Sequence, residues 1–358
     1  MVNKIDFIEL YVGNALQAAM YYQHIWGFEV VAFKGLETGC RDHVSYLLVQ
    51  NKIKLVITAA LSPDNAIARH VALHGDGVKN IAFETDDVYL LEEDAKRKGA
   101  KLAFPTTKQQ DKNGEVLVMG LKMYGDIIHT FIDRRQYRGI FMPMFEQKHI
   151  VGCKPTGLKA IDHITANVDR GKLDYWIDYY NRVFEFKEML SFDETDVFTD
   201  SSAINTKVST NPTQRIKIPI IQPINQAKNS QIQEFLDYNY GAGIQHIALL
   251  SQNIVDTVTQ LSEKGVEFLP ISQSYYNGLA LRLEALPTDV RILQSLNIMI
   301  DKENDGWIYQ AFTKPLVDRP TFFIEIIERK GGAKSFGKGN VKGLVESLEL
   351  EQAKRGNL

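Results

Sequence analysis

Near the C-terminal end of the chain, the segment from Thr321 to Arg329 is an apolar run interrupted by one carboxylate. Phe, Ile and Thr dominate the run, Pro320 precedes it and two glycines follow it, which is typical of a buried β-strand. Glu325 lies in the middle of this predicted strand. Because an unpaired buried charge is costly, this carboxylate needs a cation, a proton or a metal as its partner, and we expect a metal.

The same order of apolar and polar segments occurs twice along the chain. Residues 5–8 and 161–164 each begin a predicted strand, followed by an amphipathic helical pattern and a second strand. Two later glycine turns, at 75–77 and 241–243, each lead into a strand and then a helix that ends on a glycine suited to a left-handed C-cap. The strand around Thr130 then corresponds to the strand around Glu325. The two halves therefore share one architecture.

This repeat predicts two domains. The N-terminal domain is expected over residues 1–136, followed by a linker over 137–155 that carries Gly139, Pro143, Gly152 and Pro155. The C-terminal domain is expected over residues 156–358. Its last segment, from about residue 340 to 355, has the Glu, Leu and Lys content of a helix.

Composition and charge indicate a globular protein that acts on small molecules. Hydrophobic residues make up 44% and charged residues 24% of the 358 residues, and a net charge of −3 offers no basis for binding nucleic acid or an acidic membrane. The two cysteines are too few for a disulfide framework, which fits a cytoplasmic setting. No uninterrupted apolar run approaches the roughly 18 residues that span a bilayer, and no leader precedes the first strand, so we expect neither membrane insertion nor secretion.

At three equivalent positions the two halves differ in the same chemical direction. The second half carries His163, His246 and Glu325 where the first half carries Phe7, Asn80 and Thr130. Two neutral imidazoles and one carboxylate form the facial triad that holds Fe(II) and leaves open positions for substrate and dioxygen. Taken singly, each residue also has a structural interpretation, as a hydrogen-bonded core histidine or a carboxylate paired with an arginine. Their joint occurrence at equivalent positions favours a metal site in the C-terminal domain.

Longer segments carry a resemblance to a known family. They are Gly-Ala-Gly-Ile-Gln-His-Ile-Ala at 241–248, Gln-Ala-Phe-Thr-Lys-Pro at 310–315, Asp-Arg-Pro at 318–320, Phe-Ile-Glu-Ile-Ile-Glu-Arg at 323–329 and Phe-Gly-Lys-Gly-Asn at 336–340. With them the chain resembles, over nearly its whole length, the 4-hydroxyphenylpyruvate dioxygenases and 4-hydroxymandelate synthases of the vicinal oxygen chelate superfamily. The resemblance implies an α+β fold with two tandem domains, each of paired βαβββ modules that form an open β-barrel, and a C-terminal lid helix.

The resemblance also implies roles for individual residues. His163, His246 and Glu325 would bind Fe(II), and the partners would be a small 2-oxo acid and O2, without external 2-oxoglutarate. The chain would form a homo-oligomer, either a dimer or a tetramer. Phe312 and Phe323 would flank the substrate ring, although core filling is an alternative role for both. The implied substrate-binding residues are Thr206, Pro219, Ile221, Gln231, Gln245, Gln310, Phe312, Phe323, Asn340, Val341, Leu344 and Val345.

The product depends on which substrate carbon is oxidised after decarboxylation. Ring hydroxylation yields homogentisate, and benzylic hydroxylation yields 4-hydroxymandelate. Ile221 stands where the dioxygenases carry asparagine and the synthases isoleucine, and Val341 stands where the dioxygenases carry phenylalanine and the synthases a smaller branched residue. Both changes alter the pocket wall and favour 4-hydroxymandelate, because pocket geometry decides which carbon is attacked. Pro219 and the Lys314-Pro315 pair keep the dioxygenase pattern, so homogentisate is the alternative product.

Two other classes of protein share part of this pattern. An extradiol ring-cleaving dioxygenase would have the twin domains and the triad, but it has no reason to carry the Gly-rich segment and the terminal helix. A binding protein that sequesters a ligand would have the barrels, but such proteins usually lack the metal triad. Loss of iron binding with retained ligand binding would favour the binding protein.

Overall fold

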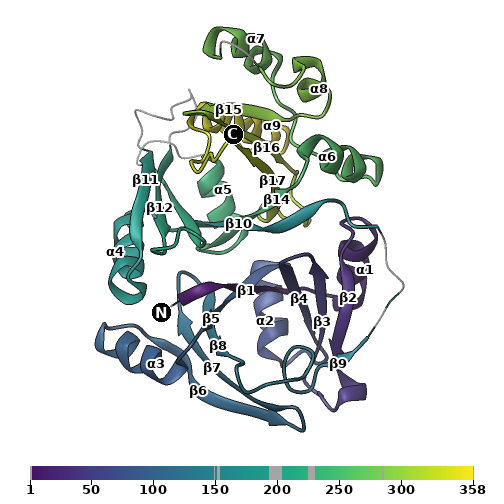
Figure 1. Ribbon diagram of the computed structural model, residues 1–358, viewed down its shortest axis with the longest axis vertical. Coiled ribbons are helices and arrows are strands. Elements are labelled where there is room, and N and C mark those ends of the chain that lie inside the picture. Colours follow the sequence, from purple (N-terminus) through teal and green to yellow (C-terminus); the bar gives the residue numbers. More distant parts are fainter. Residues whose placement is uncertain are drawn as a thin grey trace.

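The structure is a computed structural model that describes residues 2–148, 150, 154–192, 204–224, 230–283 and 286–357. Two curled sheets dominate it, and Figure 1 shows the N-terminal sheet in the lower half and the C-terminal sheet in the upper half. Among the helices in these parts of the chain, none has both the length and the apolar character needed to cross a membrane.

The N-terminal sheet has nine strands in the order β6-β7-β8-β5-β1-β4-β3-β2-β9. The strands are β1 (Val2–Tyr11), β2 (Glu29–Lys34), β3 (His43–Gln50), β4 (Ile53–Ala60), β5 (Gly77–Thr85), β6 (Leu102–Asp111), β7 (Gly114–Lys122), β8 (Ile128–Asp133) and β9 (Glu146–Gln147). The helical segments of this domain are α1 (Ala15–His24), the 3-10 turn η1 (Leu36–Thr38), α2 (Ala66–His74) and α3 (Val88–Arg97).

The C-terminal sheet has eight strands in the order β11-β12-β13-β10-β14-β17-β16-β15. The strands are β10 (Leu158–Asn167), β11 (Lys187–Phe192), β12 (Ile204–Thr210), β13 (Lys217–Pro223), β14 (Gly243–Ser251), β15 (Met299–Glu303), β16 (Gly306–Phe312) and β17 (Phe323–Lys330). The helices are α4 (Leu173–Phe184), α5 (Gln231–Tyr238), α6 (Ile254–Glu263), α7 (Gln273–Arg282), α8 (Val290–Ser295) and α9 (Lys338–Lys354).

Each sheet is built from two copies of one module. In the N-terminal sheet β1 pairs in parallel with β4, β5 pairs in parallel with β8, and the antiparallel pair β1 and β5 joins the two modules. In the C-terminal sheet β10 and β13, β14 and β17, and β10 and β14 repeat these three pairings. In neither sheet do the two end strands pair with each other, so each sheet curls into an open barrel. The predicted α+β fold of paired βαβββ modules is confirmed.

The strand registers align the two domains residue by residue. β1 and β5 pair Phe7 with Ala82, whose other neighbour across the sheet is Thr130 on β8. In the C-terminal sheet Ala248 has the same place between its two partners. The equivalent positions are Phe7 and His163, Asn80 and His246, and Thr130 and Glu325.

The two helices α3 and α6 show that the repeat extends to the ends of elements. Asp87 caps the first turn of α3 by accepting a hydrogen bond from the Leu90 N–H, and Asn253 caps α6 in the same way. Beyond the other end, Gly99 and Gly265 have φ angles of +80° and +92°, a conformation that glycine adopts without the strain of a side chain. The predicted glycine C-caps are confirmed.

Part of the predicted linker 137–155 lies against the N-terminal sheet. β9 pairs with β2 at the sheet edge, and Tyr137 and Phe141 are buried in an apolar cluster with Phe7. Residues up to Gln147 therefore belong structurally to the N-terminal domain, and Tyr137 and Phe141 contribute to its core. The exact domain boundaries stay a prediction.

The two domains share buried contacts. One continuous apolar cluster contains residues of both sheets, including Ile8 of β1 and Ile164 of β10. Within it, the His129 side chain of β8 hydrogen-bonds through Nε2 to the Tyr180 hydroxyl of α4 at 2.6 Å. His129 is fully buried, and this burial lowers the pKa of its imidazole to about 3.

We predict that His129 makes folding less favourable in acid. The unfolded histidine takes up a proton below about pH 6.5, whereas the folded one resists protonation until about pH 3, so stability falls as pH falls between these values. From pH 7 to pH 5 this histidine lowers the free energy of unfolding by about 2 kcal/mol. Urea unfolding at both pH values measures this change. In His129→Gln, which keeps a polar group towards Tyr180, the drop in unfolding free energy from pH 7 to pH 5 should be about 2 kcal/mol smaller than in the wild type. His24→Gln, at an exposed histidine, is the control and should match the wild type.

Candidate active site

The three predicted metal ligands lie together inside the C-terminal barrel. His163 of β10, His246 of β14 and Glu325 of β17 are all buried, and their candidate ligand atoms lie within 4.8 Å of one another. The Glu325 Oε2 atom lies 3.1 Å from His163 Nε2 and 3.4 Å from His246 Nε2. Three neighbouring strands thus bring both imidazoles to one carboxylate oxygen.

Hydrogen bonds orient both imidazoles. His163 Nδ1 donates to Asp162 Oδ1 at 2.8 Å, and His246 Nδ1 donates to Gln245 Oε1 at 3.0 Å. With both Nδ1 atoms used as donors, both Nε2 lone pairs face Glu325. Three electron-rich atoms converge at this point, so the site requires a cation between them.

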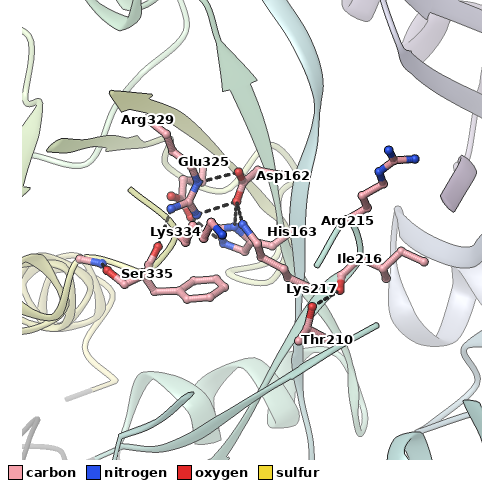
Figure 2. A network of polar contacts seen from close by, with 12 residues as sticks. Asp162, His163, Thr210, Arg215, Ile216, Lys217, Glu325, Arg329, Lys334 and Ser335 are labelled. Carbon is pink, nitrogen blue, oxygen red and sulfur yellow. Dashed lines mark hydrogen bonds and ion pairs between the residues drawn. The ribbon is translucent and has the colours of Figure 1, made fainter. Parts of the chain in front are cut away.

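An ion-pair network holds the carboxylate that orients His163. Arg329 forms two hydrogen bonds of 2.8 Å to Asp162, one to each carboxylate oxygen, and the Lys217 ammonium lies 3.8 Å away. Figure 2 shows Asp162 between Arg329 and His163, with Glu325 beside them. Burial by itself would raise the pKa of Asp162, but Arg329 and His163 outweigh it and hold the pKa below its usual value. Asp162 therefore remains an acceptor for His163.

The charges at the site favour metal binding. Burial alone would raise the pKa of Glu325, but the two histidines overcome this effect and lower it to about 2. Burial lowers the pKa of His246 despite the nearby Glu325, which keeps this imidazole neutral. Burial also acts to lower the pKa of His163, but Glu325 and Asp162 outweigh it and raise the pKa overall. A metal ion that binds here needs the neutral imidazole, so metal binding and protonation of His163 compete.

The donor set fits a transition-metal ion. Two ligands at right angles, each about 2.1 Å from a metal, lie about 3.0 Å apart, close to the 3.1 and 3.4 Å separations observed. Two imidazoles and one carboxylate on one side of an ion form the facial triad typical of non-haem Fe(II) oxygenases. His163, His246 and Glu325 would hold the ion.

A second group with the right residue types lies between the domains. His70 and His74 of α2 and the Asp126 carboxylate also have candidate ligand atoms within 4.8 Å of one another. Here the Lys79 ammonium lies 3.5 Å from His70 Nδ1 and hydrogen-bonds to the Asp126 carbonyl. His74 contacts the Asn239 carbonyl of the other domain at 2.6 Å. Because Lys79 already supplies a cation, we interpret this group as an interdomain contact.

A cavity of about 80 Å³ adjoins the three candidate ligands. Its wall comes from strands of the sheet, from α5 and from α9, which covers it as a lid. Apart from the candidate ligands, the predicted residues that line it are Thr206, Pro219, Ile221, Gln231, Gln245, Gln310, Phe312, Asn340, Val341, Leu344 and Val345. α9 begins and ends within two residues of the helix expected over about 340–355.

Phe323 lies behind the cavity wall. Its ring stacks on the His246 imidazole, with centroids 4.9 Å apart and planes inclined by 24°, and it does not line the cavity. It supports a candidate ligand directly, whereas Phe312 lines the cavity itself. A role for Phe323 beside the substrate ring stays a prediction.

Five cavity residues were not assigned to the site from the sequence: Thr165, Val208, Ile232, Phe336 and Leu348. Two of them could have been found from periodicity. Val208 lies two residues after Thr206 on the same strand face, and Leu348 extends the helical spacing of Val341, Leu344 and Val345 by one turn. Asp162 could have been found from the repeat, because Asp6 stands at the equivalent position and both halves carry an equivalent arginine, Arg134 and Arg329.

A chain of hydrogen bonds links the lid to Glu325. Gln310 Nε2 donates to Glu325 Oε1 at 3.0 Å, and Asn340 Nδ2 of α9 donates to Gln310 Oε1 at 2.8 Å. The Tyr275 hydroxyl lies 2.6 Å from Asn340 Oδ1 and completes the chain. The position of α9 and the orientation of the Glu325 carboxylate are therefore coupled.

We predict that His246→Ala abolishes retention of Fe(II). The change removes one of three ligands and should lower metal affinity by more than about 100-fold. Metal content after anaerobic loading and desalting measures this effect. Asn80→Ala changes the equivalent position of the N-terminal domain and should retain the metal of the wild type. A His246→Ala protein that keeps a full equivalent of iron would contradict the ligand assignment.

Comparison with known proteins identifies the family. A sequence model of the glyoxalase, bleomycin-resistance protein and dioxygenase superfamily matches residues 160–287, which include two of the candidate ligands. The chain is 40% identical to 4-hydroxyphenylpyruvate dioxygenase of Caenorhabditis elegans, over 99% of this chain and 93% of that protein. It is 38% identical to the enzyme of the same name from Dictyostelium discoideum, over 99% of both chains.

The fold comparison agrees with the sequence comparison. A triple mutant of 4-hydroxymandelate synthase from Streptomyces coelicolor superimposes with a TM-score of 0.87 and 28% identity, over 98% of this chain and 99% of that one. The synthase structure and this one therefore share one fold over nearly their full lengths. The chain belongs to the 4-hydroxyphenylpyruvate dioxygenase family of non-haem iron dioxygenases.

Proposed function

We propose that this enzyme binds Fe(II) through His163, His246 and Glu325 and converts 4-hydroxyphenylpyruvate and O2 into homogentisate and CO2. The observation that carries the proposal is the convergence of these three residues beside a cavity. The resemblance leads us to expect a homo-oligomer, a dimer or a tetramer, and the composition leads us to expect a cytoplasmic enzyme.

The choice of homogentisate rests on the relatives. Ile221 and Val341 favoured 4-hydroxymandelate in the sequence analysis, but relatives of 38% to 40% identity over nearly the whole chain are dioxygenases by name. The synthase structure is less similar, at 28% identity. The comparisons thus support homogentisate better than 4-hydroxymandelate.

The cavity has polar atoms suited to a substrate with a polar end. The Thr165 hydroxyl, the Thr206 hydroxyl and the Gln231 carbonyl oxygen line the cavity, are buried and have no hydrogen-bond partner among the described residues. Buried polar atoms without partners are costly, so a ligand that supplies hydrogen bonds is favoured there. A phenolic hydroxyl and the oxygens of a 2-oxo acid meet this need.

In the proposed mechanism the chain mainly positions the substrate. Bound Fe(II) supplies the redox chemistry that activates dioxygen and a positive charge for the 2-oxo acid. Gln310 holds one oxygen of Glu325 through its amide, so the other oxygen stays directed at the histidines. The apolar residues of α9, including Leu344 and Leu348, cover the cavity and exclude water.

A second candidate function, formation of 4-hydroxymandelate, rests on the cavity wall. Ile221 and Val341 both line the cavity and belong to one apolar cluster with Val345. An asparagine at 221 would add an amide to this wall, and a phenylalanine at 341 would add a ring. Without them the substrate ring has room to shift and to bring its benzylic carbon towards the reacting oxygen.

The main prediction concerns the product. The protein is loaded with Fe(II) without air and mixed with 4-hydroxyphenylpyruvate and then air, and the products are separated and identified by mass. Homogentisate is expected as the main product, with CO2 released in equal amount. Predominant 4-hydroxymandelate would instead support the second candidate, and absence of both products would overturn the proposed activity.

The double substitution Ile221→Asn with Val341→Phe tests the cavity wall. Because it restores both the amide and the ring, we expect any fraction of 4-hydroxymandelate made by the wild type to fall at least about threefold. The effect is measured as the amount of each product formed per O2 consumed. Each single substitution serves as a comparison. An unchanged ratio in a variant that still binds iron and turns over would rule out control by these two positions.

A further inference from the structure

The N-terminal barrel contains a pocket where the C-terminal barrel contains the active site. Glu9, Ser45, Val56 and Asn80 line this pocket, which has a volume of about 330 Å³ against about 80 Å³ for the catalytic cavity. A volume in this range is that of many small-molecule sites.

Strand registers show that the two pockets occupy equivalent places in the repeat. Ser45 pairs with Thr58 on β4, as Thr206 pairs with Ile221 on β13. Val56 of β4 corresponds to Pro219, and Asn80 of β5 corresponds to His246. The N-terminal domain has thus kept the cavity of the repeat while carrying other side chains in it.

Aromatic rings form much of the pocket wall. Phe7 and Phe104 come from β1 and β6, and Phe141 and Phe145 come from the segment that follows the barrel. Phe7 and Phe141 meet edge to face, as do Phe141 and Phe145, with centroids 5.2 and 4.9 Å apart. This wall suits a flat aromatic ring. The segment at 141–145 lies over the N-terminal pocket as α9 lies over the catalytic one.

The floor of the pocket offers hydrogen-bond acceptors. The Thr58 hydroxyl donates to Glu9 Oε1 at 2.8 Å and accepts from the Ser45 hydroxyl at 2.8 Å, so both hydroxyl protons are used within the protein. The Asn80 amide N–H group donates to Glu9 Oε2 at 3.4 Å. Asn80 is only 4% exposed, and its carbonyl oxygen has no partner among the described residues. A ligand that donates a hydrogen bond would satisfy this oxygen.

The rim of the pocket carries a positive charge. Lys34 lies at the end of β2 and lines the pocket, and it forms no ion pair within the parts of the chain that the structure describes. Lys34 pairs with Ser45, and Ser45 pairs with Thr58, so a line of paired residues leads from the rim to the floor. Asn80 lies on β5, two strands beyond β4 in the sheet order, and the curled sheet brings Lys34 and Asn80 to the same pocket. The ligand therefore needs a donor at one end and a negative charge at the other.

We propose that the N-terminal pocket binds an aromatic acid whose ring carries a hydroxyl or amino group at the end away from its carboxylate. The hydroxyl or amino group would donate to the Asn80 carbonyl oxygen, the ring would lie among the four phenylalanines, and the carboxylate would pair with Lys34. This site is separate from the iron site and does not depend on the proposed reaction.

Calorimetric titration of the full-length, Fe(II)-loaded protein under nitrogen tests the proposal. The probe is 3-(4-hydroxyphenyl)propionate, and 3-phenylpropionate is the matched ligand without the hydroxyl. Asn80→Leu should lower the affinity for the hydroxylated probe about tenfold, which is the effect of one lost hydrogen bond. The affinity for 3-phenylpropionate should not change. Lys34→Met should lower the affinity for both ligands, because both carry the carboxylate. Turnover of 4-hydroxyphenylpyruvate should stay that of the wild type in both variants.

The outcomes separate this pocket from the catalytic one. If the probe binds only beside the iron, neither substitution in the N-terminal domain will change its affinity, and the proposal fails. It also fails if the wild type does not bind the probe. If Asn80→Leu does not fold, Lys34→Met at the partly exposed rim decides alone, because loss of affinity for both acids supports the site and unchanged affinity overturns it.

Discussion

The convergence of two imidazole nitrogens on one buried carboxylate oxygen is the constraint on which the C-terminal domain depends. His163 and His246 direct their Nε2 atoms at Glu325 Oε2, and all three side chains are buried. Without a cation such an arrangement is strongly unfavourable. The surrounding groups act to preserve it, since Asp162, Gln245 and Gln310 each use a hydrogen bond to set the direction of one ligand.

Both domains contain the ion-pair network that lies behind His163, whereas only the C-terminal domain carries the candidate metal ligands. Asp6 pairs with Lys54 and Arg134 in the N-terminal domain, at the positions of Asp162, Lys217 and Arg329. There the next residue is Phe7, so the carboxylate only ties the first strand to its neighbours. The C-terminal domain uses the same carboxylate to orient an imidazole as well. A fold-stabilising ion pair and a ligand-orienting contact are thus combined in one residue.

The N-terminal barrel shows what the repeat retains without metal ligands. With Phe7, Asn80 and Thr130 in place of the triad, its pocket has aromatic walls and acceptors on the floor, and it is covered by the segment after the barrel. The catalytic pocket is lined by α9, whose Asn340 reaches Glu325 through Gln310. In the C-terminal domain the lid and the candidate metal site are therefore one connected unit.

The sequence by itself determined the repeat, the strands that carry it and the three candidate ligands. Alternation and apolar runs are local properties, and a repeat compares each position with its own counterpart, so Glu325 and the two histidines stood out without knowledge of contacts. The other predicted residues of the catalytic cavity were expected from the family resemblance, and only the tertiary structure brought β12, β13, α5 and α9 together around one cavity. It also placed Phe323 behind His246, β9 on the edge of the N-terminal sheet, and Lys34 and Asn80 in the wall of one pocket. These placements depend on packing between distant segments, which no local pattern records.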